Sequence, residues 1–196
     1  MGNRIIYLVR HGQYKNNSQD SEEPDGPLTV LGREQAVFTA KRLQSIPFSV
    51  IHHSTLKRAT ETAVIIAQQF PDIPLKPSNT LKECIPCVPD GYAQYFTNIP
   101  QEEIDKGNAW AKNAFTAYIQ PLPNNIAKDQ FELIVAHGNL INYIIGQAIK
   151  APEESWLFTD IENGAVSQVT IFPSGITKLS RHNDVGHFPP HLITTS

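Results

Sequence analysis

Short apolar runs alternate with segments of helical periodicity along most of this chain. The first run, Ile5–Val9, is apolar or aromatic at every position, which is typical of a strand buried on both faces of a sheet. The same pattern predicts strands at 50–53, 75–77 and 131–136, with helices between them. Alternating strands and helices predict an α/β fold: a three-layer sandwich with a mostly parallel central sheet flanked by helices on both faces.

Four helices are predicted from apolar residues that recur at intervals of three and four. Thr29 is the expected N-cap of the first helix, because its side chain can accept a hydrogen bond from the first turn. In the third helix, the expected core residues are Ile104, Phe115 and Ile119. The first helix is expected to follow Thr29, and the second to contain the apolar residues of Ala59–Phe70. The third is expected to span Gln101–Ile119 and the fourth Asn139–Ile149.

The C-terminal part of the chain has a different pattern. Residues 166–172 and 176–180 are predicted to form a hairpin through a Pro-Ser-Gly turn. Residues 185–196 show no periodicity. The polar stretch 13–27 and the proline-rich stretch 85–100 are expected to be loops.

Composition and charge restrict the partners and the compartment. With 196 residues and no break in composition, residues 1–196 are expected to form a single domain. The formal net charge of −3 and the lack of a long basic run disfavour nucleic acid and membranes as partners. No apolar stretch has the length of a membrane span and no signal peptide is recognised, so a cytoplasmic protein is expected.

The two cysteines, Cys84 and Cys87, are spaced C-x-x-C. Zinc needs four donors, and the sequence offers no second cysteine pair. The prolines that follow also disfavour the helix start of a thioredoxin motif. We therefore expect two reduced thiols in a loop and no metal site.

Polar side chains follow three of the predicted strands at their carboxyl ends. Arg10 and His11 follow the first strand, Arg58 comes shortly after the second, and His137 and Gly138 follow the strand 131–136. In an open α/β sheet, ligands bind beyond the carboxyl ends of the strands. We therefore expect these histidines and arginines to converge on one site.

Such a cluster is suited to a phosphate ester. Guanidinium groups match phosphate oxygens, and the small residues Gly12 and Gly138 would let backbone N–H groups approach the anion. A neutral imidazole can attack phosphorus, and its other ring nitrogen is expected to donate to a backbone carbonyl, which sets the tautomer. A second, protonated histidine would stabilise the charge on the transferring oxygens.

A leaving alcohol also needs a proton donor, and Glu83 is the candidate. A carboxyl group near phosphate oxygens has its pKa raised by like charge, which suits a general acid near neutral pH. Composition alone favours the simpler interpretation of Glu83 as a solvated surface residue.

Four segments together resemble the histidine phosphatase superfamily, also called phosphoglycerate mutase-like. Leu8–Gly12 resembles the R-H-G signature, and Leu28–Ala36 resembles the L-T-x-x-G-x-x-Q-A helix start. Ser54–Ala63 is similar to the S-x-x-x-R-A-x-x-T-A segment, and His137 with Gly138 matches the second histidine and its glycine. The segments occur in the order of the family over nearly the whole chain.

The resemblance implies a role for each candidate residue. It makes His11 the phosphorylated nucleophile and His137 the second catalytic histidine. Arg10 and Arg58 would hold phosphate, and Glu83 matches the acid at the end of an L-x-E segment. No metal and no cofactor are implied.

Within the superfamily, the likeness extends to a branch of protein serine/threonine phosphatases. It includes Gln13 and Tyr14, Asn139, and the ending Gly186–Ser196. A phosphatase for phosphoserine or phosphothreonine in proteins is therefore the first hypothesis, and a homodimer is compatible with that branch. The membrane segment and assembly motif of that branch are not recognised, so neither membrane anchoring nor large rings are expected.

Three alternatives stay open. A phosphatase that acts on a small phosphate ester is one alternative. A cofactor-dependent phosphoglycerate mutase is disfavoured because the region after Glu83 is rich in proline and nearly without cations. A non-catalytic phosphate-binding scaffold is the least favoured, because the chain retains both histidines and both arginines.

Overall fold

A six-stranded sheet forms the centre of the computed structural model, which describes residues 1–15 and 25–195. The strands are β1 (Arg4–Arg10), β2 (Phe48–Ser54), β3 (Leu75–Ser78), β4 (Gln130–Ala136), β5 (Val166–Ile171) and β6 (Thr177–Asp184). Their order is β3-β2-β4-β1-β5-β6, with β3, β2, β4 and β1 parallel. β5 runs antiparallel to β1 and pairs with β6 as a hairpin. The predicted mostly parallel sheet with its C-terminal hairpin is confirmed.

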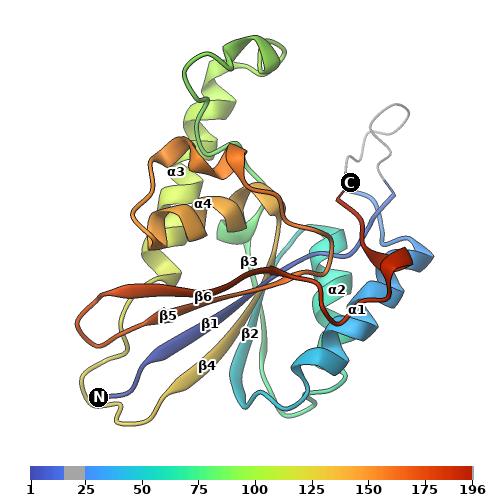
Figure 1. Ribbon diagram of the computed structural model, residues 1–196, viewed down its shortest axis with the longest axis vertical. Coiled ribbons are helices and arrows are strands. Elements are labelled where there is room, and N and C mark those ends of the chain that lie inside the picture. The colour runs from blue at the N-terminus through green and yellow to red at the C-terminus, as the bar shows by residue number, and fades with distance from the viewer. Residues whose placement is uncertain (16–24, 196) are drawn as a thin grey trace.

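Helices cover both faces of this sheet (Figure 1). They are α1 (Val30–Leu43), α2 (Lys57–Ala67), α3 (Gln101–Tyr118) and α4 (Gly138–Ala148). Short 3₁₀ turns are η1 (Asn79–Leu81), η2 (Ala93–Tyr95), η3 (Glu153–Phe158) and η4 (Pro190–Leu192). The three-layer α/β sandwich expected from the sequence is therefore confirmed.

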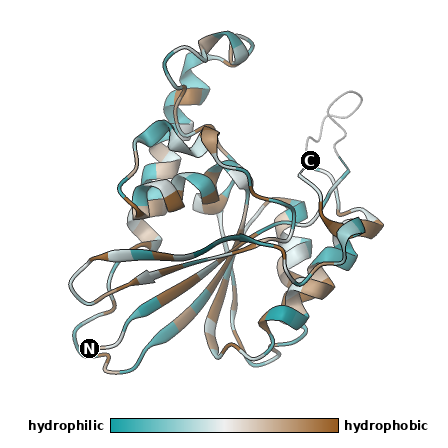
Figure 2. Ribbon diagram, viewed as in Figure 1, coloured by the Kyte–Doolittle hydropathy of each residue, from teal (hydrophilic) through white to brown (hydrophobic). Residues whose placement is uncertain are grey.

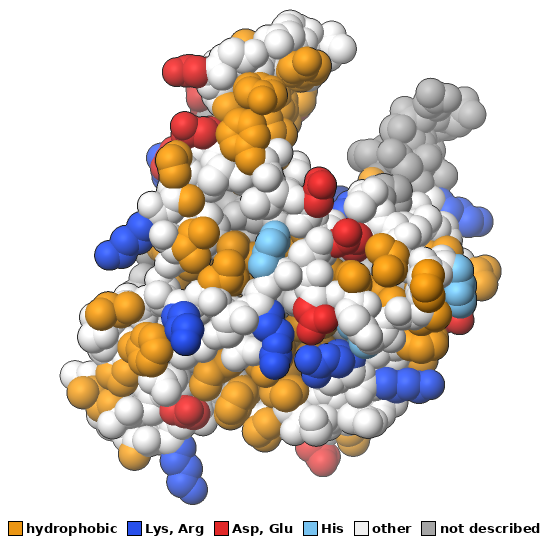
Figure 3. Space-filling model, in the orientation of Figure 1, with side chains coloured by type: hydrophobic (Ala, Val, Ile, Leu, Met, Phe, Trp, Pro, Cys, Tyr) orange, Lys and Arg blue, Asp and Glu red, His pale blue; other side chains and the backbone are white. Residues whose placement is uncertain are grey.

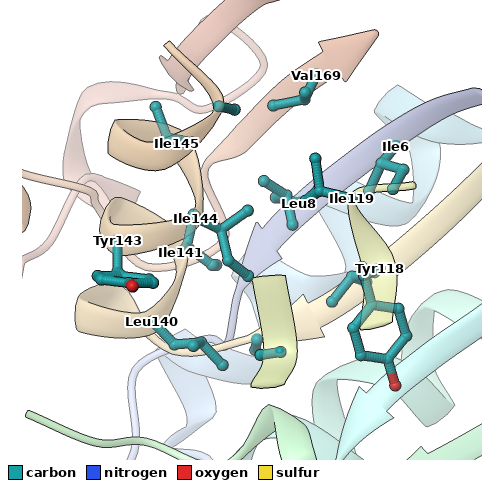
Figure 4. Close-up of a cluster of buried hydrophobic side chains, with 14 of the residues drawn as sticks. Ile6, Leu8, Tyr118, Ile119, Leu140, Ile141, Tyr143, Ile144, Ile145 and Val169 are labelled. Carbon is teal, nitrogen blue, oxygen red and sulfur yellow. The ribbon is translucent and has the colours of Figure 1, made fainter. Parts of the chain in front are cut away.

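The strand β1 separates two hydrophobic cores because its side chains alternate between the faces of the sheet. Ile5, Tyr7 and Val9 pack with residues of α1 and α2. Ile6 and Leu8 pack with residues of α3 and α4. Figure 4 shows this second core, where side chains of α4 point toward Leu8. Figure 2 shows the hydrophobic residues along the central strands and hydrophilic ones on the exposed face of α1.

The helix ends follow local chemistry. Thr29 is the N-cap of α1, as predicted, and its side chain accepts a hydrogen bond from the backbone N–H of Gly32. The helix α2 ends at Ala67 and not at Phe70, because the N–H groups of Gln69 and Phe70 bond to carbonyls three residues back. Phe70 is nevertheless buried.

The buried face of α3 differs from the prediction. It is formed mainly by small residues, which let the helix lie close to its neighbours: Gly107, Ala111, Ala114 and, at the end, Tyr118. Ile119 is buried as predicted, whereas Ile104 and Phe115 are only half-buried.

The segment after β6 packs against α1 although its sequence has no periodicity. Leu192 in η4 is fully buried, and the Gln35 side chain donates to its carbonyl over 2.7 Å. Residues 189–195 are thereby held beside the carboxyl end of β1. Among residues 1–15 and 25–195, no helix combines the length and hydrophobicity that crossing a bilayer requires.

Candidate active site

The carboxyl ends of β1 and β4 bring the two predicted catalytic histidines together. The backbone N–H of His11 donates to the carbonyl of Ala136 over 3.0 Å, which extends the pairing of the two strands by one bond. His137 follows immediately and is the N-cap of α4. The two imidazole rings are 5.0 Å apart between centroids, and both are buried.

The hydrogen bonds of His11 define one neutral tautomer. Nδ1 lies 2.8 Å from the carbonyl oxygen of Gly12, which can only accept, so Nδ1 carries the proton. Nε2 lies 3.1 Å from Nε of Arg58, which can only donate, so Nε2 presents its lone pair. This is the arrangement that the sequence predicted for a histidine nucleophile.

Burial and positive charge keep both imidazoles neutral. Burial is the main cause that lowers the pKa of His11 well below 6.5, and the charges of Arg58 and Arg10 lower it further. Burial also lowers the pKa of His137, aided by His11 and by both arginines. His137 is therefore neutral in the ligand-free site, and the protonated form expected from the sequence requires the negative charge of a phosphate.

A hydroxyl group orients the second imidazole. Ser54 Oγ lies 2.8 Å from Nε2 of His137 and also accepts from the N–H of Leu56 over 3.2 Å. When the serine hydroxyl donates to Nε2, the imidazole proton lies on Nδ1. Nδ1 is buried and finds no hydrogen-bond partner among the described residues, although an unsatisfied buried donor is costly. A phosphate oxygen would satisfy it.

Two residues that the sequence did not assign to the site hold Arg58. Asp25 Oδ1 accepts from Nη1 of Arg58 over 3.1 Å, and the other Asp25 oxygen accepts from the N–H of Lys57 at the start of α2. The guanidinium carbon lies 4.6 Å from the ring centre of Tyr14, which also packs edge-on against His11. No sequence spacing links Asp25 to Arg58, so this pair could not be found before folding.

Arg10, Glu83 and Gly138 line one cavity of about 230 Å³. Nη1 of Arg10 donates to the carbonyls of Ile161 and Thr195, which fixes the guanidinium at the wall. Gly138 is the first residue of α4, where a helix offers backbone N–H groups to an anion. Two of the predicted phosphate ligands, Arg10 and Gly138, thus line one hollow, whereas Arg58 is not among its lining residues and contacts His11.

Glu83 lies beside both arginines and is half-buried, not a solvated surface residue. Its Oε1 accepts from the N–H of Cys84 over 3.2 Å. Burial raises the pKa of Glu83, although backbone hydrogen bonds and the charges of Arg58 and Arg10 oppose the rise. Burial is therefore the main cause of the raised pKa of Glu83 in this structure. The sequence analysis attributed the rise to the negative charge of a bound phosphate.

The backbone N–H of Gly12 was predicted to approach the phosphate, but it is used within the protein. Its N–H donates to Oγ1 of Thr62 over 3.0 Å. A side chain at position 12 would meet the carbonyl oxygen of Gly32 at 2.4 Å, so Gly12 allows the loop after β1 to lie close to α1.

The loop after β1 is fixed from the C-terminal segment. Nδ2 of Asn163 donates to the carbonyl of His11 over 3.1 Å, and Thr194 Oγ1 donates to Oδ1 of Asn163 over 2.9 Å. The amide of Gln35 donates to Thr194 over 2.9 Å, and its oxygen accepts from the N–H of Gln13 over 2.8 Å. The two residues that flank Gly12 are thereby held by buried amides.

The remaining histidines and the cysteines are not part of this cluster. His53 is buried, and its Nδ1 lies 2.8 Å from the carbonyl of Ser54, while His52 contacts Glu132. Cys84 and Cys87 are free thiols, and burial raises the pKa of Cys84 to about 12. Within residues 1–15 and 25–195, no group of three or more metal-ligating side chains is found.

Comparison with known families agrees with this geometry. The model of the histidine phosphatase superfamily (branch 1) matches residues 6–185. The chain belongs to the histidine phosphatase superfamily. The predicted family is thus confirmed, and the convergence of two histidines and two arginines at the strand ends is the structural counterpart of the sequence match.

Curated relatives of this histidine phosphatase are named serine/threonine-protein phosphatase PGAM5, mitochondrial. The rat (Rattus norvegicus) protein is 36% identical over 195 residues, which are 98% of this chain and 67% of that protein. The human protein is 35% identical over 195 residues, which are 98% of this chain and 66% of that protein. This chain therefore spans about two thirds of each relative.

Solved structures share the fold. A phosphoglycerate mutase from Plasmodium falciparum has a TM-score of 0.66 at 26% identity, over 97% of this chain and 96% of its own. YhfR from Bacillus stearothermophilus has a TM-score of 0.72 at 24% identity, over 94% of this chain and 98% of its own.

The cytoplasmic location expected from the sequence is contradicted by the comparison. The PGAM5 relatives from rat, human and Caenorhabditis briggsae are all named as mitochondrial proteins. The prediction used only the lengths of apolar runs and the absence of a recognised signal peptide. Those features do not distinguish the two compartments in a chain that spans about two thirds of its relatives.

Proposed function

We propose that this chain hydrolyses phosphate monoesters through a phosphohistidine on His11, with phosphoserine and phosphothreonine in proteins as substrates. The observation that carries the proposal is the tautomer of His11, whose Nε2 lone pair lies beside the guanidinium of Arg58. The substrate class is supported by the relatives named as serine/threonine-protein phosphatases, which match 98% of the chain.

In the first half of the reaction, the phosphoryl group moves to the enzyme. Nε2 of His11 attacks phosphorus while the bond from phosphorus to the ester oxygen breaks. Glu83 gives its proton to that oxygen, so the alcohol leaves neutral and Glu83 becomes a carboxylate. The raised pKa of Glu83 favours the protonated acid that this step needs.

In the second half, water attacks the phosphohistidine. Glu83, now ionised, removes a proton from the water as the bond between phosphorus and Nε2 breaks. Inorganic phosphate leaves, and both His11 and Glu83 return to their starting states.

The other residues stabilise charge during both steps. Arg10 and Arg58 bind the phosphoryl oxygens, aided by the backbone N–H of Gly138 at the start of α4. Nδ1 of His137 donates to one of these oxygens, and the growing negative charge raises the pKa of this imidazole. Arg58 then exchanges its bond to Nε2 for bonds to the substrate.

A phosphoglycerate mutase is the second candidate, supported by the 26% identical mutase structure. A mutase holds a bisphosphate, which requires further cations near the acid. Beside Glu83, the adjoining groove offers only Lys106 among its lining residues, together with Glu103. The charges therefore favour the phosphatase, and a non-catalytic scaffold would not require the nucleophilic tautomer.

His11→Ala tests the central step. We expect it to abolish hydrolysis of p-nitrophenyl phosphate and to leave the circular dichroism spectrum unchanged. His191→Ala is the matched control, because His191 is exposed and outside the site, and it should retain full activity. Quenching the native enzyme during turnover should give an acid-labile phosphoryl adduct on His11. Activity in the His11 variant, or an adduct on serine or aspartate, would refute the mechanism.

A substrate panel separates the two activities. Phosphopeptides, small phosphate esters and phosphoglycerates are compared by kcat/KM, and phosphoglycerate isomerisation is assayed with added 2,3-bisphosphoglycerate. Highest kcat/KM for phosphopeptides supports the proposal. Isomerisation faster than hydrolysis would identify a mutase.

We also propose that residues 1–196 form one catalytic domain that associates as a homodimer. The continuous central sheet, to which both ends of the chain contribute, supports one domain. A single cooperative unfolding transition and a dimer mass in sedimentation equilibrium are the expected results.

A further inference from the structure

A groove of about 450 Å³ adjoins the cavity lined by Arg10 and Gly138, which we call the phosphate cavity. Glu83 and Asn139 line both spaces, so the acid stands at the boundary between them. Because Glu83 protonates the ester oxygen, whatever is attached to that oxygen must lie close to Glu83. The groove is therefore on the side of the leaving group, and we call it the leaving-group groove.

The walls of the leaving-group groove are largely apolar. Ile85, Ile99 and Trp110 line it, and Trp110 on α3 is 39% exposed. Its shape depends on Gly107, where a side chain would come within 2.3 Å of the carbonyl oxygen of Ile85. The loop at Ile85 therefore lies directly on α3.

The charges around the leaving-group groove disfavour an anionic leaving group. Lys106 is the one cation among its lining residues, and its Nζ already lies 2.6 Å from Glu102. Glu103 adds a negative charge to the wall. A carboxylate such as that of a phosphoglycerate would find no unpaired cation there, whereas an apolar side chain would be well accommodated.

A second apolar surface adjoins the phosphate cavity at Leu157. Leu157 lines both that cavity and a hollow of about 320 Å³ formed with Tyr92, Tyr95 and Phe96. Tyr92 packs edge-on against Phe158 with 5.5 Å between ring centres, and Tyr95 and Phe158 are exposed. Figure 3 shows hydrophobic side chains gathered on the protruding part of the molecule that contains this segment. A substrate that extends beyond its phosphate can contact these surfaces.

We propose that the leaving-group groove binds an apolar side chain next to the phosphorylated residue of a phosphopeptide, and that Trp110 determines this specificity. The inference rests on the proposed function and adds a sequence preference to it. It predicts that small polar esters are poorer substrates than such a peptide, because they carry no apolar group that could pack on Trp110.

The test compares three phosphothreonine substrates in the full chain. One peptide has leucine on both sides of phosphothreonine, the second has aspartate there, and the third substrate is N-acetyl phosphothreonine amide without neighbours. We expect the leucine peptide to exceed the aspartate peptide in kcat/KM by about tenfold or more, as for apolar pockets that discriminate between side chains.

Trp110→Ala should reduce that ratio to about twofold or less, because it removes the apolar wall. It should lower kcat/KM for the leucine peptide much more than for N-acetyl phosphothreonine amide, and Trp110→Phe should restore most of the preference. Ile176→Ala is the matched control, since Ile176 is 62% exposed and outside the leaving-group groove.

The outcomes separate the two levels of the proposal. Equal kcat/KM for both peptides in the native enzyme, or an equal loss for all three substrates in Trp110→Ala, would overturn the groove assignment and leave the phosphatase intact. Hydrolysis of small esters without any cleavage of phosphopeptides would overturn the proposed substrate class and the groove assignment together.

Discussion

Glu132 on β4 forms a buried ion pair whose energy follows from its pKa. Nε and Nη2 of Arg4 donate to its two carboxylate oxygens over 2.8 and 2.7 Å, and the Glu132 side chain is only 8% exposed. Burial alone would raise the pKa of Glu132, but the hydrogen bonds and charges of His52 and Arg4 outweigh it and lower the pKa from 4.5 to about 2. That difference corresponds to about 3 kcal/mol of folding stability.

The sign of the pH dependence follows from this lowered pKa. A carboxylate with a lowered folded-state pKa stabilises the fold fully above its ordinary pKa of 4.5, and the contribution is lost as pH falls toward about 2. Glu132→Gln should therefore reduce the free energy of unfolding by about 3 kcal/mol at pH 7. The difference between the two proteins should shrink as the pH falls from 4.5 to 3, because the native carboxylate is being protonated.

Urea unfolding at several pH values measures this difference. Glu102→Gln is the matched control: Glu102 and Lys106 are 2.6 Å apart, but their side chains are 77% and 67% exposed. Such an exposed pair within one helix contributes about 0.3–0.5 kcal/mol, so this control should barely change stability. A loss for Glu132→Gln that is constant from pH 7 to pH 3, or equal losses for both variants, would refute the reasoning.

Two further predictions concern the site. The pH profile of kcat/KM should be bell-shaped. Its acid limb reports protonation of His11 and lies below pH 6.5, because burial lowers the pKa of His11. Its alkaline limb reports ionisation of Glu83 and lies above pH 4.5, because burial raises the pKa of Glu83. Glu83→Gln should remove the alkaline limb with p-nitrophenyl phosphate, and an unchanged profile would exclude Glu83 as the acid. Ser54→Ala should lower kcat about tenfold with little change in KM, since it removes one hydrogen bond that orients His137. A change in KM alone, measured in the same steady-state assay, would contradict this role.

The parts of the site that lie at strand ends could be predicted from the sequence. Arg10, His11 and His137 follow apolar runs that read clearly as strands, and parallel strands bring their carboxyl ends to one edge of the sheet. The position of Arg58 follows in the same way from β2. The apolar pattern of the strands and the rule that ligands bind at the carboxyl ends of parallel strands were sufficient to predict that these residues meet.

Other features depend on tertiary contacts and could not be predicted. Asp25 binds Arg58 from a loop 33 residues away, and Thr194 reaches Gln35 across 159 residues, neither with any periodic signal. The prediction for α3 was wrong in placing large apolar side chains on its buried face, which is formed mainly by small residues. The neighbouring loop at Ile85 instead requires the small residue Gly107.

The bonds from the C-terminal segment to the loop after β1 also bear on the order in which the molecule folds. Arg10 and Thr195 are 185 residues apart, and His11 and Asn163 are 152 apart. Contacts between such distant residues close large loops, and they form slowly compared with helices. A refolding chain therefore regains its helical content before its nucleophile is fixed in place, so catalytic competence is acquired at the end of folding.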